Sequence, residues 1–236
     1  MDFFTAPPPR VREQEKEKED PPWAGPPNDI LGGVVPIERM LFRSETLAIF
    51  LTSAVAFPAG VTIRLQMAAR RVEGVNEDTW WDRHDLMFGH HQHRFRAEDS
   101  LPDEVVRFGV RFPDGAKATT VDGRTDSGEW PPPRPEGPIL KRSRGGSASG
   151  DDRSVSSSWS LWLWPLPPPE PLEFAVEWPL YDVPLTFTEV DGAAIVAAAD
   201  RAQPYWGQTK SSVGVRPIRA QVTSPGGGTA SERQGR

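Results

Sequence analysis

Residues 61–70 alternate between apolar and polar side chains, and this alternation constrains the fold more than any other feature of the chain. In an extended segment Val61, Ile63 and Leu65 point to one face. Thr62 and Arg64 point to the other face. The pattern is typical of an antiparallel strand with one face in the core and the other in water.

The segment before this strand, residues 46–57, is apolar or small on both faces. That composition is typical of a central strand covered on both sides. Residues 58–60, Pro-Ala-Gly, form a turn signal between the two segments. Together they predict a β-hairpin in the core. Its buried side chains are expected to be Leu47, Ile49, Leu51, Ile63 and Leu65.

Most of the other apolar segments also have a period of two. Further strands are predicted at 105–112, 117–121, 158–166, 172–178 and 185–190. Residues 77–88 change to a helical period after the N-cap candidate Asn76, and a short alanine-rich helix begins after Asp191 and ends at Pro204. The fold class predicted is mostly β, an antiparallel β-sandwich with one or two short helices and disordered tails.

Proline and glycine, 26 and 21 residues, gather outside these segments and indicate the domain limits. We expect a disordered, proline- and charge-rich N-terminal tail over 1–33 and a disordered C-terminal tail over 207–236. Between them, 34–206 is predicted to be a single β-sandwich domain. Its low-complexity stretch 122–156 is predicted to be a disordered insertion, with a linker between two domains as the alternative.

One set of segments carries a resemblance. The sequences RFGVRFPDG at 107–115, WLWPLPPPEPL at 162–172 and Glu-Trp-Pro at 177–179 resemble those of a group of uncharacterised, β-rich actinobacterial proteins. The resemblance covers about a third of the chain, within the predicted strands. It implies no activity, cofactor or site residue.

Composition excludes several classes of function. The chain has no cysteine, so disulfides, thiolate metal sites and cysteine nucleophiles are absent. The net charge of −6 argues against nucleic acid as a partner. The N-terminus lacks the pattern of a signal peptide, and no apolar run is long enough to span a membrane. A cytoplasmic location without a membrane partner is expected.

The four histidines lie within ten residues, at His84, His90, His91 and His93. In an extended segment His91 and His93 would point the same way, as zinc ligands can. This spacing supports a hypothesis of a metal-binding protein or a metal-dependent enzyme, with His90 as a further candidate. The alternative is a polar surface loop without metal, and we expect no cofactor.

Nine tryptophans are present, and two of them define a candidate surface. Trp162 and Trp164 share one face of the strand 158–166, whose opposite face is apolar as well. Such a strand is either central and covered on both faces or carries an aromatic platform for a ligand. The candidate binding surface consists of Trp162, Trp164, Pro165 and Trp178.

No motif points to catalysis. The chain has no nucleophile elbow, phosphate loop or dinucleotide fingerprint, and we predict no catalytic residue. The leading hypothesis is a non-catalytic β-sandwich interaction module that binds a protein partner or a second copy of itself. The alternatives are the metal-binding function of His91 and His93, and a carbohydrate-binding module that uses Trp162 and Trp164.

Overall fold

The computed structural model describes residues 20–87, 101–122 and 131–207. The chain divides into one unit that ends at Tyr205 and another that begins at Trp206, and the fold below is that of the first unit. Most of both tails predicted to be disordered, 1–19 and 208–236, lies outside the described residues. Among the described residues no helix is long and apolar enough to cross a membrane.

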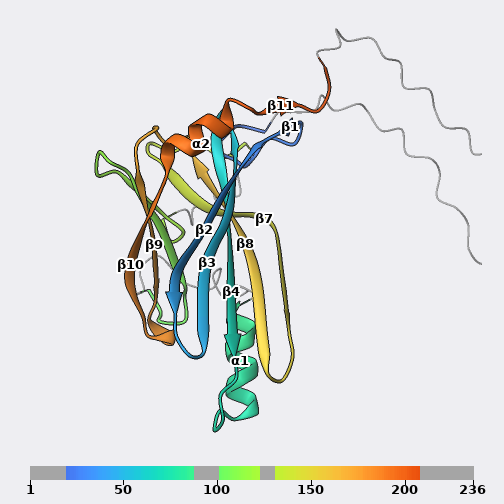
Figure 1. Ribbon diagram of the computed structural model, residues 1–236, viewed down its shortest axis with the longest axis vertical. Coiled ribbons are helices and arrows are strands. Elements are labelled where there is room, and N and C mark those ends of the chain that lie inside the picture. The colour runs from blue at the N-terminus through green and yellow to red at the C-terminus, as the bar shows by residue number, and fades with distance from the viewer. Residues whose placement is uncertain (1–19, 88–100, 123–130, 208–236) are drawn as a thin grey trace, which may run out of the picture. The chain divides into compact units, whose positions relative to one another are not determined.

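Five strands form the larger sheet, which is antiparallel throughout, in the order β2-β3-β4-β8-β7 (Figure 1). Their bounds are β2 Gly33–Arg43, β3 Leu47–Phe57, β4 Gly60–Arg70, β8 Ser154–Trp164 and β7 Ile139–Gly150. In β3 and β4 the alternation of the sequence places the apolar residues on the inner face. The predicted hairpin is confirmed, because Leu47, Ile49, Leu51, Ile63 and Leu65 are all buried.

Four strands form the second sheet, also antiparallel, in the order β10-β9-β5-β6. Their bounds are β10 Val183–Val190, β9 Leu172–Trp178, β5 Arg107–Arg111 and β6 Lys117–Thr119. Phe108, Phe174 and Trp178 are among the side chains that this sheet contributes to the interior. A two-stranded ribbon pairs β1, Ile30–Leu31, with β11, Gln203–Pro204.

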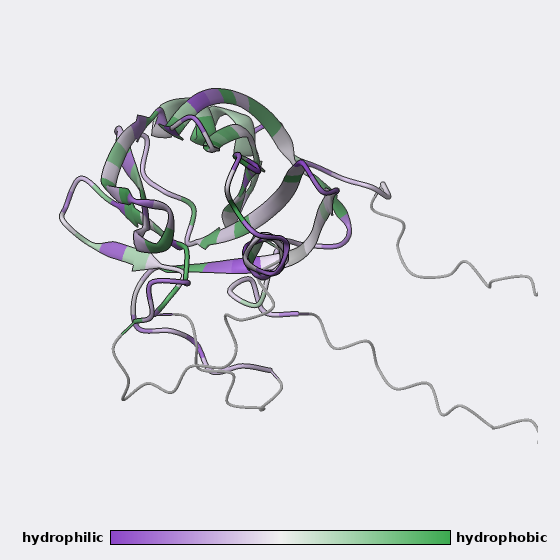
Figure 2. Cartoon of the chain, turned by 90° about the horizontal axis from the view of Figure 1, so that it is seen from below, coloured by the Kyte–Doolittle hydropathy of each residue, from purple (hydrophilic) through white to green (hydrophobic). Residues whose placement is uncertain are grey.

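The two sheets enclose one hydrophobic core and approach each other along both edges. Strand β10 lies beside β2, and β6 lies beside β7. Figure 2 looks along the strands and shows both sheets around this common interior, which buried side chains fill. The mostly β, antiparallel fold with two short helices agrees with the prediction.

Two helices lie at opposite ends of the strands (Figure 1). Helix α1, Glu77–Met87, begins where the Asn76 side chain accepts a hydrogen bond from the Thr79 N–H at 2.7 Å. Helix α2, Gly192–Ala199, has Asp191 as its N-cap and buries Ile195 and Ala198. Both caps follow the predicted positions, since a short polar side chain satisfies a free N–H of the first turn. A single 3₁₀ turn, η2 over Pro179–Tyr181, follows β9.

The predicted domain limits need two corrections. Within the stretch 122–156 predicted to be a disordered insertion, residues 139–150 form strand β7 at the edge of the larger sheet, and residues 154–156 begin β8. Residues 30–31 and 33, assigned to the N-terminal tail, belong to β1 and β2. The low-complexity composition hid β7, because an edge strand with a solvent-facing side can consist largely of Ser, Gly and Arg.

Candidate functional site

The candidate surface lies on the outer face of β8, near the end where β3 turns into β4. Trp162 is 0% exposed, and its indole lies against Gly60. A Cβ atom at Gly60 would lie 2.6 Å from the indole atom Cζ2, so glycine provides the space that the ring occupies. Phe57 contacts the same indole edge-on, with the ring centroids 6.0 Å apart.

The chain itself covers these aromatic rings with residues 20–27, which we call the N-terminal strap. The Trp162 indole N–H donates to the carbonyl oxygen of Pro22 at 3.1 Å. Trp23 of the strap packs edge-on against Trp164, with ring centroids 5.8 Å apart and planes at 66°. Thus Trp162, Trp164 and Phe57 form an aromatic face that a proline-rich segment occupies.

A second proline-rich segment completes this arrangement. The Trp23 indole N–H donates to the carbonyl oxygen of Pro132 at 2.9 Å. The guanidinium carbon of Arg134 lies 6.0 Å from the centre of the Trp23 ring and 5.7 Å from that of Trp164. A cation at this distance from an aromatic face is attracted by the ring quadrupole. Arg134 therefore connects the strap to the aromatic face.

Sequence reasoning missed Pro22, Trp23, Pro132 and Arg134, because all four fall in segments predicted to be disordered. One feature of the sequence could have indicated that residues 20–27 dock on the domain. Trp23 is a large aromatic residue inside the proline-rich run Pro21-Pro22-Trp23. Exposure of so large an apolar side chain to water is unfavourable. The indole therefore indicated that this run docks on the folded domain.

The predicted surface residues have different environments. Trp164 is half-buried beneath the strap and Pro165 is exposed. Trp178 is 0% exposed and faces the core, and its N–H donates to the carbonyl oxygen of Glu104 at 3.0 Å. Trp178 thus belongs to the hydrophobic core between the sheets, whereas Trp162 is buried on the outer face of β8 beneath the strap. An open tryptophan platform for a sugar does not exist on this face while the strap covers it.

The metal-site candidates His90, His91 and His93 lie outside the described residues, as does the His84 side chain. Among the residues that the structure describes, no group of three or more His, Asp or Glu side chains is placed to hold a metal ion. The metal hypothesis therefore stays a hypothesis about residues 90–93.

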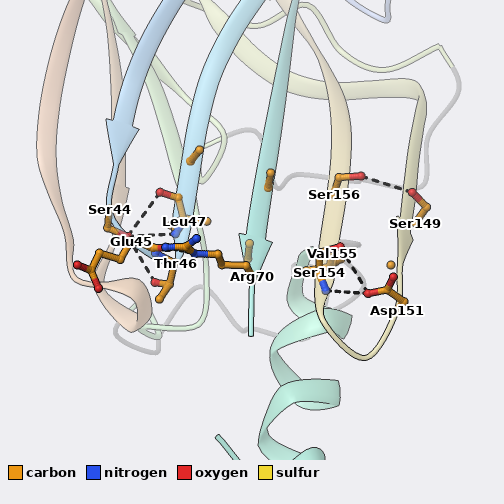
Figure 3. A pocket seen from close by; sticks show the side chains of 14 residues that line it. Ser44, Glu45, Thr46, Leu47, Arg70, Ser149, Asp151, Ser154, Val155 and Ser156 are labelled. Atoms are coloured by element: carbon orange, nitrogen blue, oxygen red, sulfur yellow. Dashed lines mark hydrogen bonds between the residues drawn. The ribbon is translucent and has the colours of Figure 1, made fainter. Parts of the chain in front are cut away.

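A polar hollow of about 590 Å³ lies at the opposite end of the larger sheet (Figure 3). Strands β3, β4, β7 and β8 and their turns supply its lining. The labelled side chains are Ser44, Glu45, Thr46, Leu47, Arg70, Ser149, Asp151, Ser154, Val155 and Ser156. The hollow is open, and its lining combines hydroxyl side chains with apolar ones such as Leu47, Ala68 and Val155.

Several polar groups of the hollow make hydrogen bonds within local turns. Ser44 Oγ accepts the N–H groups of Thr46 and Leu47 at 3.2 and 3.0 Å. The N–H groups of Arg153 and Ser154 donate to the Asp151 carboxylate and hold its pKa below the usual range. A lowered pKa makes this carboxylate a weak base. Asp151 is therefore a poor activator of the Ser154 hydroxyl, 3.5 Å away.

Fold and site together define an antiparallel β-sandwich with an aromatic face that its own proline-rich segment covers. Comparisons with protein-family models, with curated proteins and with solved structures find no match to this chain. The resemblance of residues 107–115 and 162–172 to actinobacterial proteins stays an interpretation of the sequence.

Proposed function

We propose that this chain is a non-catalytic protein-interaction module that binds a proline-rich segment of a partner protein on the aromatic face. The hydrogen bond from the Trp162 indole to the Pro22 carbonyl carries the proposal. In this structure the chain's own strap occupies the site. A partner segment would exchange with the strap and make the same contacts.

The chemistry of proline-rich segments suits such a face. Proline lacks a backbone N–H, so a proline-rich segment has carbonyl acceptors but few N–H donors for the hydrogen bonds of a sheet. In the strap the run forms a turn, in which the Ala24 N–H donates to the Pro21 carbonyl at 2.7 Å. Proline fixes its own φ angle before binding, which lowers the entropy lost on docking. Aromatic-lined grooves with an indole donor are a recurring way to bind them. Trp162 supplies the donor, and Trp164 and Phe57 supply the aromatic walls.

The tethered strap competes with any external ligand. A short tether gives an effective concentration in the millimolar range, so a partner peptide binds weakly as long as the strap is docked. Weakening the strap should therefore raise the apparent affinity for an added peptide. Trp23→Ala removes the strap's contact with Trp164 and its hydrogen bond to Pro132.

The test uses a fluorescein-labelled peptide with the sequence of residues 19–29 and the full chain. We expect the Trp23→Ala variant to bind the peptide at least about ten-fold more tightly than the parent chain in fluorescence anisotropy. A peptide with alanine at every proline should not bind. Trp81→Ala, a change of an exposed tryptophan on α1, serves as the matched control and should leave binding at the parent level.

The decisive variant adds Trp162→Phe to Trp23→Ala, which keeps an aromatic ring on the aromatic face but removes the N–H donor together with one ring of the indole. Binding of the peptide should fall at least about ten-fold, as expected for loss of one hydrogen bond and of part of the packing surface in a closed site. Circular dichroism and thermal unfolding confirm that each variant is folded. Unchanged binding after loss of the donor, or no binding to any folded variant at about 1 mM peptide, would contradict the proposal.

A further inference from the structure

The outer face of the four-stranded sheet carries an ordered pattern of charge. Strands β9 and β10 contribute only acidic charges to it, whereas β5 and β6 contribute only basic ones. The acidic members are Glu173, Glu177 and Glu189, and the basic members are Arg107, Arg111 and Lys117. We call these six residues the charged face.

The strand register arranges these charges in rows across the sheet. One row runs from Glu189 through Glu173 and Arg111 to Lys117, each residue directly opposite the next. A second, shorter row pairs Glu177 with Arg107, whose guanidinium lies 2.6 Å from the carboxylate. Each row is therefore acidic at the β10 side and basic at the β6 side.

Between these rows lies an apolar row made of Phe187, Ala175, Gly109 and Thr119. Phe187 is 41% exposed, and its neighbour Leu185 on the same strand is 56% exposed. Gly109 has no side chain, and a Cβ atom there would meet Ala175 and Thr119 only at ordinary contact distance. The centre of the face therefore has a partly exposed aromatic ring on one side, with the Arg111 guanidinium carbon 4.3 Å from its centroid, and small side chains on the other.

We propose that this face binds a second copy of the chain through a two-fold axis parallel to the strands. That axis lays β10 of one copy over β6 of the other, and β9 over β5. Glu189 then faces Lys117 of the second copy, and Glu173 faces its Arg111. Phe187 of each copy covers the small residues Thr119 and Gly109 of the other.

Two-fold interfaces use the same patch on both copies and require a self-complementary surface. The acidic and basic halves of the charged face meet this requirement. The in-sheet pairs Arg107–Glu177 and Arg111–Glu173 become members of four-charge networks, which fix the orientation more than they add affinity. Phe187 and Leu185 supply most of the buried apolar area, as aromatic centres of interfaces do.

The area of the charged face limits the affinity that we expect for the dimer. Strands in a sheet lie about 4.8 Å apart, so four strands give a face only about 15–20 Å wide. Its strands have only three to eight residues, so the interface is smaller than a standard one and belongs with weak, transient contacts. We expect a dissociation constant on the order of 10 μM. This inference concerns the four-stranded sheet and does not depend on the aromatic face of the other sheet.

The test measures the mass of the full chain by sedimentation equilibrium between about 1 and 200 μM. The parent chain should change from monomer to dimer over this range, and added salt should favour the monomer. Phe187→Ser should reduce dimerisation at least about ten-fold. Val72→Ser, a change of an exposed apolar residue outside both sheets, is the matched control and should have no effect.

Complementary charge variants give the sharpest result. The variant Glu173→Lys with Glu189→Lys makes its long row wholly basic, and Arg111→Glu with Lys117→Glu makes it wholly acidic. Each variant alone should stay a monomer, and an equimolar mixture should form a heterodimer. Far-ultraviolet circular dichroism checks that both are folded. A parent chain that is monomeric at 200 μM, or charge variants that still dimerise alone, would overturn the inference.

Discussion

Buried tryptophans hold the irregular segments of this protein to its sheets. The indole N–H of Trp80 donates to the Asp151 carbonyl at 3.0 Å, and that of Trp159 to the Met87 carbonyl at 3.2 Å. Trp162 and Trp178 bond to Pro22 and Glu104 in the same way. A large ring brings apolar area, and its single donor finds a partner when it is buried. In Trp80, Trp159 and Trp178 the ring packs in the core while the N–H group fixes a hairpin turn, a helix or a loop. The ring of Trp162 is buried on the outer face, where its N–H group fixes the strap.

The buried side chain of Tyr181 predicts a pH dependence of the protein's stability. Its hydroxyl is buried and has no hydrogen-bond partner among the residues that the structure describes. Burial raises its pKa to about 12, with nearby Arg83 acting in the opposite direction. The folded pKa therefore lies above the unfolded value of about 10. Because the neutral phenol is favoured in the folded state, its contribution to stability is complete below pH 10 and is lost as the pH rises through 12.

We therefore expect the free energy of unfolding of the parent chain to fall more between pH 9 and pH 12 than that of Tyr181→Phe. At neutral pH the variant should be at least as stable as the parent, since it removes a buried polar group that has no partner. Chemical denaturation at each pH measures both, and the absorbance difference near 295 nm between the two proteins follows the ionisation of Tyr181. An ionisation near pH 10 in that difference would contradict the expectation.

The histidine hypothesis is tested by metal analysis. We expect the purified protein to carry no stoichiometric zinc before or after dialysis against a chelator. His91→Ala should change the free energy of unfolding by less than about 0.5 kcal/mol, as for a surface residue. Bound zinc that is lost together with stability in this variant would instead favour the metal-binding function.

At the scale of elements, alternation and capping were enough to predict most of the fold. The hairpin of β3 and β4, the strands β5 and β9 and both helices follow local patterns of apolar and capping residues. Strand β7 could not be predicted from a local pattern, because its glycines suggest a linker. The structure uses them as a β-bulge, where the register against β8 shifts between Arg142 and Gly146.

The aromatic face could be predicted only in part. The apolar character of both faces of β8 indicated that something must cover Trp162 and Trp164. It did not indicate which segment, because the strap lies more than a hundred residues earlier in the chain and its docking depends on tertiary packing. A bulge and a distant contact leave no local period in the sequence.

The bulge itself can be tested by mutation. Gly145 has φ +101°, and a Cβ atom at Gly146 would lie 2.5 Å from the Ser158 carbonyl oxygen. Gly145→Ala and Gly146→Ala should each lower the free energy of unfolding by about 1 kcal/mol or more, since an L-side chain is strained at one site and clashes at the other. Gly137→Ala is the matched control, because a Cβ atom there meets nothing within 4 Å. Equal stability of all three variants would rule out this account of the bulge.

At the scale of the whole molecule, both sheets combine strands from the two halves of the chain. Strands β2 to β4 pair with β8 and β7, and β5 and β6 join β9 and β10. This arrangement supports a single domain, since neither half has a complete sheet of its own.

A protease site engineered between residues 123 and 130 tests that conclusion. After complete cleavage the two fragments should elute together in size-exclusion chromatography at the position of the intact chain. The larger sheet joins them through ten residue pairs between β4 and β8, and the smaller sheet through five pairs between β5 and β9. Denaturant should be needed to separate them. Fragments that separate in buffer alone would instead indicate two domains joined by a linker.

The same mixed pairing has a consequence during synthesis. Strand β3 ends at Phe57 and β10 at Val190, so about 130 residues are translated between the first apolar strand and the last one that covers the core. At about 5–20 residues per second, the nascent chain exposes unpaired apolar strands for roughly 7–26 s. Chaperones that hold nascent chains have that interval in which to bind it. A slowly translated or prematurely terminated copy is accordingly an aggregation hazard, whereas the finished chain can close its core at once.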